Sequence, residues 1–329
     1  MRRRLVALTV VPLLLFGTAA CGDDAGGDGT GATTVDMGDN ISGLEVTGDV
    51  GEAPKVTVDA PLEIDDTQTQ VIKAGDGNPV VENEQVLLHL YLANGKTGEK
   101  AAATYDQGVP FHVKQVTDGQ LWPGVLDAIV GKPVGSRVAV AAVPKDAFGS
   151  AGNPQLKIGG KDNVLFVVDI MSVEPTEVLD GPEGDEASDS PTDIPTVAEK
   201  DGGGAAGLTF ENAPKKPSGE LQVIPLIEGD GPAVRDDSLV TFDYLGQVYG
   251  TDNVFDQSYS KEPVPFPVGI GGLIKGWDEG LVDLKRGSRV LIITPPEYGY
   301  GEQGNPEVGI KGTDTLAFVV DILGVDEPS

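Results

Sequence analysis

The sequence predicts an α+β protein in which one strand-rich module is used twice. Three observations lead to this prediction. The chain contains a long internal repeat, each repeat combines alternating apolar strands with a single helical segment, and stretches rich in glycine and proline separate the repeats. A chain of 329 residues is long enough for two domains of ordinary size.

The internal repeat has a constant spacing over most of its length. A shift of 152 positions aligns residues 121–173 with 273–325 without a gap, and upstream the shift becomes 154. A shared spacing over this length indicates one fold used twice. The matching segments include Gly-Ser-Arg-Val at 135–138 and 287–290, Phe-Val-Val-Asp-Ile at 166–170 and 318–322, and Gly-Asp-Gly at 75–77 and 229–231.

Within each repeat the pattern of side chains predicts strands and one helix. Alternating β-branched and aromatic residues predict strands at Leu239–Leu245, Arg289–Thr294 and Thr315–Leu323. The segment Ile274–Leu284 differs, because its apolar residues recur at helical spacing on one face. Each module is therefore expected to be a twisted antiparallel β-sheet wrapped on one short α-helix.

The start of the chain has the layout of a secretory signal. Met1–Arg4 is basic, Leu5–Phe16 is apolar, and Thr18-Ala19-Ala20 supplies small residues before Cys21, the chain's single cysteine. Residues 18–21 resemble the bacterial lipobox, which implies that 1–20 is a signal peptide and that Cys21 is acylated. The expected location is the outer face of the cytoplasmic membrane, with acyl chains as the anchor. The alternative is an ordinary signal peptide that ends near a lone cysteine.

Two stretches with few bulky apolar residues are predicted to lack a packed structure. They are a flexible tether at 21–62 and a disordered linker at 175–218. This assignment leaves one domain at 63–174 and a second at 219–326.

Five segments of the second repeat share an order and spacing that is specific when taken together. They are Val240–Gly246, Phe255-Asp256, Leu273–Gly280, Pro296–Gly301 and Leu316–Ile322. Across 219–326 the chain resembles the FKBP-type peptidyl-prolyl cis–trans isomerases. The resemblance implies an isomerase that needs no cofactor and no metal.

The resemblance also implies a pocket for proline in the second domain. Trp277 would form its floor, Tyr244, Phe255 and Phe318 its walls, and Asp256 and Tyr300 its polar rim. Leu273 and Ile274 would lie at the entrance, where the Ile274 amide would hold a ligand carbonyl, and Val308 and Ile310 would come from the loop before the last strand. Phe242 and Phe266 are assigned to core packing. Val264 stands where the family usually has a phenylalanine, and together with Gly271-Gly272 this implies altered affinity for macrolides of the tacrolimus and rapamycin kind.

The first repeat lacks most of these aromatic residues. At the matching positions Val125 replaces Trp277, Leu90 replaces Tyr244 and Phe148 replaces Tyr300, while Tyr105-Asp106 is expected to replace Phe255-Asp256. Trp122, at the place of Ile274, is expected to fill part of the space. The first domain is thus predicted to be a degenerate module that folds but catalyses poorly. Whether it binds unfolded chains or serves as a spacer stays open.

Composition narrows the possible partners. The chain has 52 acidic against 23 basic residues, a formal net charge of −29, and such a surface repels nucleic acid. The two histidines, His89 and His112, stand apart in the sequence, which argues against a metal site. We expect a monomeric folding helper for exported proteins that acts on proline-containing polypeptides. The alternative is a non-catalytic proline-binding or chaperone lipoprotein that uses the same groove.

Overall fold

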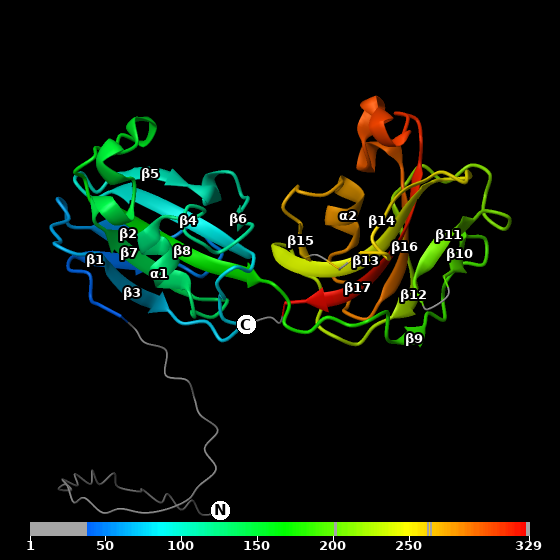
Figure 1. Ribbon diagram of the computed structural model, residues 1–329, viewed down its shortest axis with the longest axis horizontal. Coiled ribbons are helices and arrows are strands. Elements are labelled where there is room, and N and C mark those ends of the chain that lie inside the picture. The colour runs from blue at the N-terminus through cyan, green and yellow to red at the C-terminus, as the bar shows by residue number, and fades with distance from the viewer. Residues whose placement is uncertain (1–37, 201–202, 262, 264, 327–329) are drawn as a thin grey trace, which may run out of the picture. The chain divides into compact units, whose positions relative to one another are not determined.

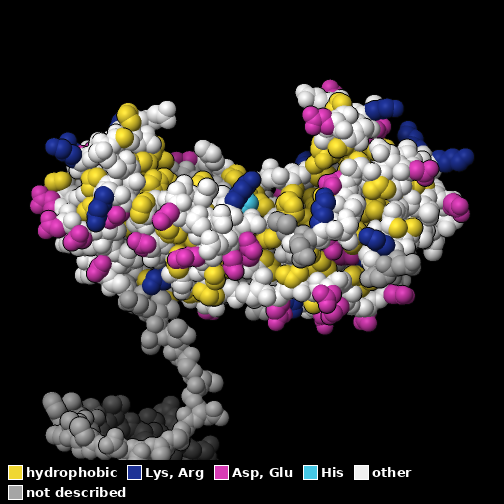
Figure 2. Space-filling view, viewed as in Figure 1, with side chains coloured by type: hydrophobic (Ala, Val, Ile, Leu, Met, Phe, Trp, Pro, Cys, Tyr) yellow, Lys and Arg dark blue, Asp and Glu magenta, His cyan; other side chains and the backbone are white. Residues whose placement is uncertain are grey.

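The computed structural model describes residues 38–200, 203–261, 263 and 265–326 (Figure 1). Cys21, the predicted site of acylation, and Val264, a predicted pocket residue, lie outside these ranges. The part of the chain that is described contains no helix long and apolar enough to cross a membrane. Acidic side chains are spread over the face of the molecule shown in Figure 2.

The N-terminal module contains a six-stranded antiparallel sheet and one α-helix. The sheet has the order β3-β7-β8-β4-β5, and β6 pairs with β4. Helix α1 (Pro123–Ile129) buries Val125, Leu126 and Ile129 against one face of this sheet. The strands are β3 (Gln68–Lys73), β4 (Val86–Asn94), β5 (Lys100–Ala103), β6 (Phe111–Val113), β7 (Arg137–Ala142) and β8 (Val164–Val173).

The C-terminal module repeats this arrangement with an additional strand. Its sheet has the order β14-β13-β17-β16-β12-β9, and β15 pairs with β13. Helix α2 (Lys275–Gly280) packs on the face that carries Phe242, Val320 and Ile322. The strands are β9 (Asp185–Glu186), β12 (Gln222–Glu228), β13 (Ser238–Val248), β14 (Val254–Gln257), β15 (Pro265–Val268), β16 (Arg289–Thr294) and β17 (Leu316–Val325).

The strand register confirms that one fold is used twice. His89 of β4 lies opposite Asp169 of β8, and Asp243 of β13 lies opposite Asp321 of β17. Because successive residues of a strand face opposite sides of a sheet, this shared register puts matching positions on matching faces. The predicted fold class, two modules that each wrap an antiparallel sheet on a short helix, is confirmed.

The helix of the C-terminal module is shorter than predicted. It ends at Gly280, with Leu281 as its C-cap, and does not continue to Leu284. Asp283 has a φ of +68°, which is left-handed and incompatible with an α-helix. Leu281 and Leu284 nevertheless pack on the core from the turn that follows the helix, so apolar spacing alone extended the prediction too far.

Both stretches predicted to be unstructured contain strands. The predicted tether holds the hairpin β1–β2 (Leu44–Thr47 and Lys55–Val58), and the predicted linker holds the hairpin β10–β11 (Thr196–Glu199 and Ala205–Thr209). Each hairpin packs on the face of its sheet that the α-helix leaves uncovered, through the clusters around Leu165 and Leu291. Each of these four strands is only four or five residues long. Their alternation is therefore too short to stand out in stretches with few bulky apolar residues.

The interdomain segment is attached to the C-terminal module along most of its length. We call residues 179–214 the wrapping segment. It donates backbone hydrogen bonds from Leu179 to Leu323 (2.9 Å) and from Glu183 to Gly287 (2.9 Å), and Tyr249 donates its hydroxyl proton to the carbonyl of Pro214 (2.9 Å). The prediction of a disordered linker is therefore wrong for the described part of this segment.

The residue before β13 is an aspartate whose burial has a measurable consequence. Burial and the neighbouring Asp236 carboxylate raise the pKa of Asp237 from its usual 3.8 to about 6. The unfolded chain loses this proton at lower pH than the folded chain does. Stability is therefore lost as the pH rises from about 4 to about 6, and the loss persists at neutral pH.

Asp237→Asn is expected to stabilise the protein by about 1 kcal/mol at pH 7.5, after allowing for solvent screening at this half-buried site. Asparagine tolerates the φ of +64° found here. Urea unfolding at pH 7.5 and pH 3.5 checks this expectation, because the difference between variant and wild type should vanish at the lower pH. An equal gain at both values would show that the carboxylate's ionisation is not the cause.

Candidate active site

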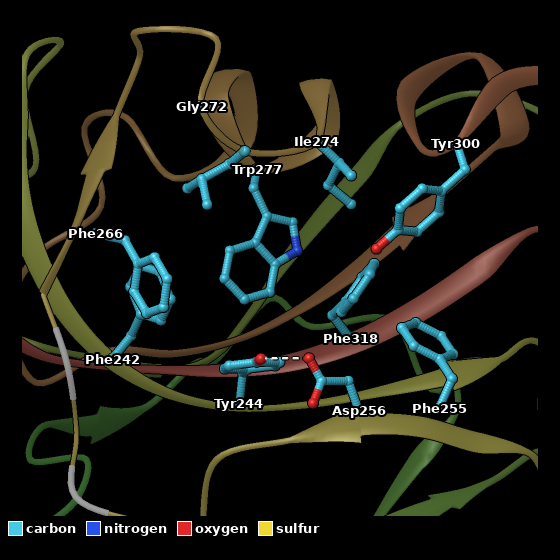
Figure 3. A pocket seen from close by; sticks show the side chains of 11 residues that line it. Phe242, Tyr244, Phe255, Asp256, Phe266, Gly272, Ile274, Trp277, Tyr300 and Phe318 are labelled. Atoms are coloured by element: carbon cyan, nitrogen blue, oxygen red, sulfur yellow. Dashed lines mark hydrogen bonds between the residues drawn. The ribbon is translucent and has the colours of Figure 1, made fainter. Parts of the chain in front are cut away.

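A cavity of about 380 Å³ opens between α2 and the sheet of the C-terminal module (Figure 3). Its lining comes from strands β13, β14, β15 and β17, from α2 and the segment leading into it, and from the loop after β16. The lining residues are Phe242, Tyr244, Phe255, Asp256, Phe266, Gly272, Leu273, Ile274, Trp277, Tyr300 and Phe318.

Aromatic rings meet edge to face around Trp277. Its ring centre lies 5.2 Å from that of Tyr244, 4.9 Å from Phe242 and 5.3 Å from Phe318, with interplanar angles between 74° and 89°. Such edge-to-face contacts are the favoured geometry for aromatic pairs and fix the orientation of each ring. Trp277 is only 5% exposed, so it closes the base of the cavity.

Phe242 and Phe266 also line the cavity, which corrects their assignment to core packing alone. Their rings stack at 5.3 Å with an interplanar angle of 11°. Phe242 precedes Tyr244 by two residues on β13, and the two side chains therefore point to the same face of the sheet. This alternation in Val-Thr-Phe-Asp-Tyr was visible in the sequence and could have placed Phe242 in the wall.

Two polar groups stand at the edge of this apolar cavity. The Tyr244 hydroxyl donates a hydrogen bond of 2.5 Å to Oδ2 of Asp256. Burial and this carboxylate raise the pKa of Tyr244 above its usual value, so the phenol keeps its proton. Tyr300 is 37% exposed and points its hydroxyl toward the cavity from the opposite side (Figure 3).

Two glycines allow the walls to come this close. A Cβ on Gly246 of β13 would lie 2.6 Å from the Phe255 ring and 2.8 Å from the Phe318 ring. A Cβ on Gly276 of α2 would lie 2.8 Å from Cγ2 of Thr294. Any side chain at these positions would push the aromatic wall or the helix outward.

Not every predicted pocket residue lies at this cavity. Ile310 is 2% exposed and belongs to the core cluster, and Val308 is 37% exposed on the surface; neither is part of the lining. Leu273 and Ile274 do line the cavity, with Ile274 at the N-cap of α2.

The N-terminal module has small or apolar residues where the cavity's key groups stand. Leu92 pairs with Ala102 just as Gly246 pairs with Asp256, so Ala101 and Ala102 occupy the places of Phe255 and Asp256. The expectation that Tyr105-Asp106 takes these places is wrong. Trp122 packs against Phe148 at 5.5 Å and Phe166 at 5.1 Å, on the side where the other module has its cavity.

The true counterpart of Tyr105 is Tyr259, which sequence reasoning missed. Tyr105 donates its hydroxyl proton to Asp169, and Tyr259 donates to Asp321, each beside a buried arginine. The shift of 154 that relates the upstream parts of the repeats also relates these tyrosines. Continuing the alignment with this shift for about thirty residues beyond Gly-Asp-Gly would have paired the two tyrosines.

The two histidines have partners within the fold of the N-terminal module. Nδ1 of His89 lies 2.8 Å from the Thr104 hydroxyl, and its ring stacks on Tyr105 at 4.5 Å. Nε2 of His112 lies 2.7 Å from Oε1 of Gln85. Among the described residues no three His, Cys, Asp or Glu side chains are grouped so that they could hold a metal ion.

Comparison with known proteins gives the family. The family model described as FKBP-type peptidyl-prolyl cis-trans isomerase matches residues 77–171 and 231–323, together more than half of the chain. A relative named FK506-binding protein from Streptomyces anulatus is 34% identical over 111 residues, which cover 33% of this chain and 90% of the relative. The peptidyl-prolyl cis-trans isomerase Fkbp12 of Drosophila melanogaster is 38% identical over 108 residues, which cover 32% and 98%.

Among solved structures, the three FKBP domains of wheat FKBP73 align with 79% of this chain and 94% of their own, at 19% identity and a TM-score of 0.33. The family match extends over both modules, and the sheet-and-helix fold occurs in each. The chain therefore belongs to the family of FKBP-type peptidyl-prolyl cis–trans isomerases, with two tandem domains of that family.

Proposed function

We propose that the C-terminal module alone catalyses X–Pro isomerisation, and that the cavity around Trp277 is its active site. The observation that carries this proposal is the contrast between matching positions. The aromatic and polar groups of the cavity are gathered in the C-terminal module, whereas Leu90, Ala101, Ala102 and Val125 stand at their places in the N-terminal module.

Isomerisation of an X–Pro bond requires an apolar, water-excluding environment and no nucleophile. Rotation about a peptide bond has a barrier of about 18–20 kcal/mol because twisting breaks the amide resonance. A twisted amide is less dipolar than a planar one, so an apolar cavity that excludes water favours it over the ground state. Trp277 would contact the proline ring from below, and Tyr244, Phe255 and Phe318 would enclose it.

The polar groups would hold the substrate chain in place. Asp256 and Tyr300 face the cavity from two sides, and the backbone N–H of Ile274, at the start of α2, would hold a substrate carbonyl. Catalysis would then be distributed over binding contacts, with no single proton carrier. The proposed substrates are proline-containing polypeptides, and a macrolide ligand is proposed from the relatives named for binding FK506.

The cellular location is proposed from the predicted signal peptide and Cys21 alone. The basic and apolar start of the chain and Cys21 support an exported lipoprotein that assists the folding of exported proteins at the outer face of the cytoplasmic membrane. The second candidate is a monomeric proline-binding or chaperone lipoprotein that uses the same cavity without catalysis.

An exchange assay on the full mature chain tests the assignment of catalysis. The double variant Asp256→Ala/Tyr300→Phe is expected to lower kcat/KM for an X–Pro peptide by about tenfold or more, because both rim groups are lost. Trp122→Leu in the N-terminal module serves as the matched control and should leave the rate unchanged. NMR exchange spectroscopy measures both.

A wild-type chain that is folded but does not accelerate exchange would rule out the enzyme and favour the proline-binding alternative. A rate that falls with Trp122→Leu and not with the double variant would move catalysis to the N-terminal module.

A further inference from the structure

A buried ion pair in the C-terminal module lies on the sheet face opposite the cavity. Arg289 donates from Nε to Oδ1 of Asp321 (2.6 Å) and from Nη2 to Oδ2 (2.7 Å), and their side chains are 7% and 2% exposed. Asp321 follows Val320, which faces the cavity side, so the alternation of the strand turns the pair toward the hairpin β10–β11.

Tyr259 is the third member of this network. Its hydroxyl donates to Oδ2 of Asp321 (3.0 Å), and burial beside that carboxylate raises the pKa of Tyr259 above its usual value. The phenol therefore keeps the proton that it donates.

The hairpin holds both ends of the network. Glu199, the last residue of β10, accepts a hydrogen bond of 2.8 Å from Nη1 of Arg289. Directly before β11, a Cβ on Gly204 would lie 2.6 Å from the Tyr259 ring, so the backbone of the hairpin packs directly on this ring.

Tyr259 is also joined to the cavity, through the residue before it. Ser258 donates its backbone N–H to the carbonyl of Tyr244 (2.9 Å), and its hydroxyl accepts the backbone N–H of Tyr244 (2.8 Å). Asp256 lies only two residues before Ser258, as the next-to-last residue of β14. Both partners of the Tyr244–Asp256 hydrogen bond are thus attached to the segment that Tyr259 anchors.

We propose that Tyr259 is a positioning residue for the Tyr244–Asp256 pair. The hairpin β10–β11 fixes Tyr259 through the Arg289–Asp321 ion pair and through ring packing, and so forms part of the isomerase module although it does not touch the cavity. This inference rests on the proposed function, because it assigns the positioned pair to the active site.

The N-terminal module provides a matched control. Tyr105 donates to Oδ2 of Asp169 (2.6 Å), and Nε of Arg137 donates to Oδ1 (2.6 Å), while the carbonyls of Gly48, Asp49 and Glu52 before β2 accept from the same arginine. The N-terminal module thus has the same network, but the edge of its sheet carries Ala102 at the position of Asp256. Tyr105→Phe removes the equivalent hydrogen bond, but only the C-terminal module has a Tyr–Asp pair that the loss could displace.

The test uses the full chain with Tyr259→Phe and Tyr105→Phe. Phenylalanine keeps the ring packing and removes only the donated hydrogen bond. Tyr259→Phe is expected to lower kcat/KM for X–Pro exchange roughly tenfold, since small displacements of positioned groups have large effects on rate. Glu199→Gln, an exposed site far from the cavity, should cause a smaller decrease, and Tyr105→Phe should cause none.

A second readout does not depend on catalysis. The chain has two tryptophans, Trp122 and Trp277, and so gives one indole N–H signal from each module. Because the Tyr244 ring meets Trp277 edge to face, a shift of Tyr244 changes the ring current at Trp277. Tyr259→Phe should move the Trp277 signal and leave the Trp122 signal in place.

The outcomes separate this inference from the proposed function. If Tyr259→Phe lowers only the unfolding temperature, by as much as Tyr105→Phe does, while kcat/KM and the Trp277 signal stay at wild-type values, the positioning role is overturned. If the wild-type chain shows no isomerisation but the Trp277 signal moves in Tyr259→Phe, the proposed function fails and the positioning role stands.

Discussion

Asp321→Asn is expected to lower the free energy of unfolding of the C-terminal module by about 3–5 kcal/mol. The reason is that the buried Arg289 would keep only the exposed Glu199 as a countercharge. Its guanidinium donates twice to Asp321, and both side chains are almost fully enclosed between the sheet and the hairpin β10–β11. An exposed ion pair would contribute at most about 1 kcal/mol. A loss of this size approaches the whole stability of an ordinary domain.

Urea unfolding of the full chain, followed through the indole signals of Trp277 and Trp122, measures this loss module by module. Asp169→Asn is the matched variant, since Asp169 binds Arg137 in the same way, and it should destabilise the N-terminal module only. A change below 1 kcal/mol in the Trp277 transition of Asp321→Asn would mean that water or Glu199 compensates the arginine, contrary to our expectation.

A fragment that begins at Gly219 is expected to fold poorly, whereas a fragment that begins at Pro175 should fold. The shorter fragment lacks the wrapping segment, which buries Leu208 against Leu245, Leu291 and Val319. Burying a leucine-sized side chain contributes about 1.5–3 kcal/mol, so loss of Leu208 alone costs about that much. In addition, the Gln247 side chain would lose the N–H and the carbonyl of Leu208 as partners and keep only its hydrogen bond to the Thr251 carbonyl.

Circular dichroism and binding of a hydrophobic dye by the two fragments check this expectation, because exposed apolar sheet surface binds such a dye. The same melting temperature for both fragments would show that the wrapping segment contributes no stability. In that case the domain boundary at 219, predicted from the sequence, would also be the boundary of the folding unit.

Sequence patterns predicted the parts of the fold that repeat or alternate over a long stretch. The strands around Phe242, Arg289 and Phe318 were found because their alternation extends over six or more residues, and the repeat fixed their order. The cavity lining was predicted mainly through the family resemblance. Phe242 was assigned to packing because a sequence does not distinguish a ring that fills a core from one that also borders a cavity.

The features that the sequence did not predict depend on tertiary contacts, which cannot be recognised in a short segment. The hairpin β10–β11 has one leucine and several small residues, and it is a strand pair only because Leu208 and Ala205 find the uncovered face of the sheet. The end of α2 depends on the left-handed Asp283, a conformation that an aspartate rarely adopts. The role of Tyr259 depends on Asp321, which is 62 residues away in the sequence.

The hairpins and the cavity lie on opposite faces of the sheets, and this separation bears on how such a chain changes over time. The N-terminal module has a hairpin, a buried ion pair and a tyrosine like those of the C-terminal module, but it has Leu90, Ala102 and Val125 at the places of groups that line the cavity. Binding chemistry can thus be lost, or gained, without disturbing the half of the module that keeps it folded. For protein engineering, the N-terminal module is a ready scaffold in which a second cavity of this kind could be built by exchanging side chains on the helix-covered face.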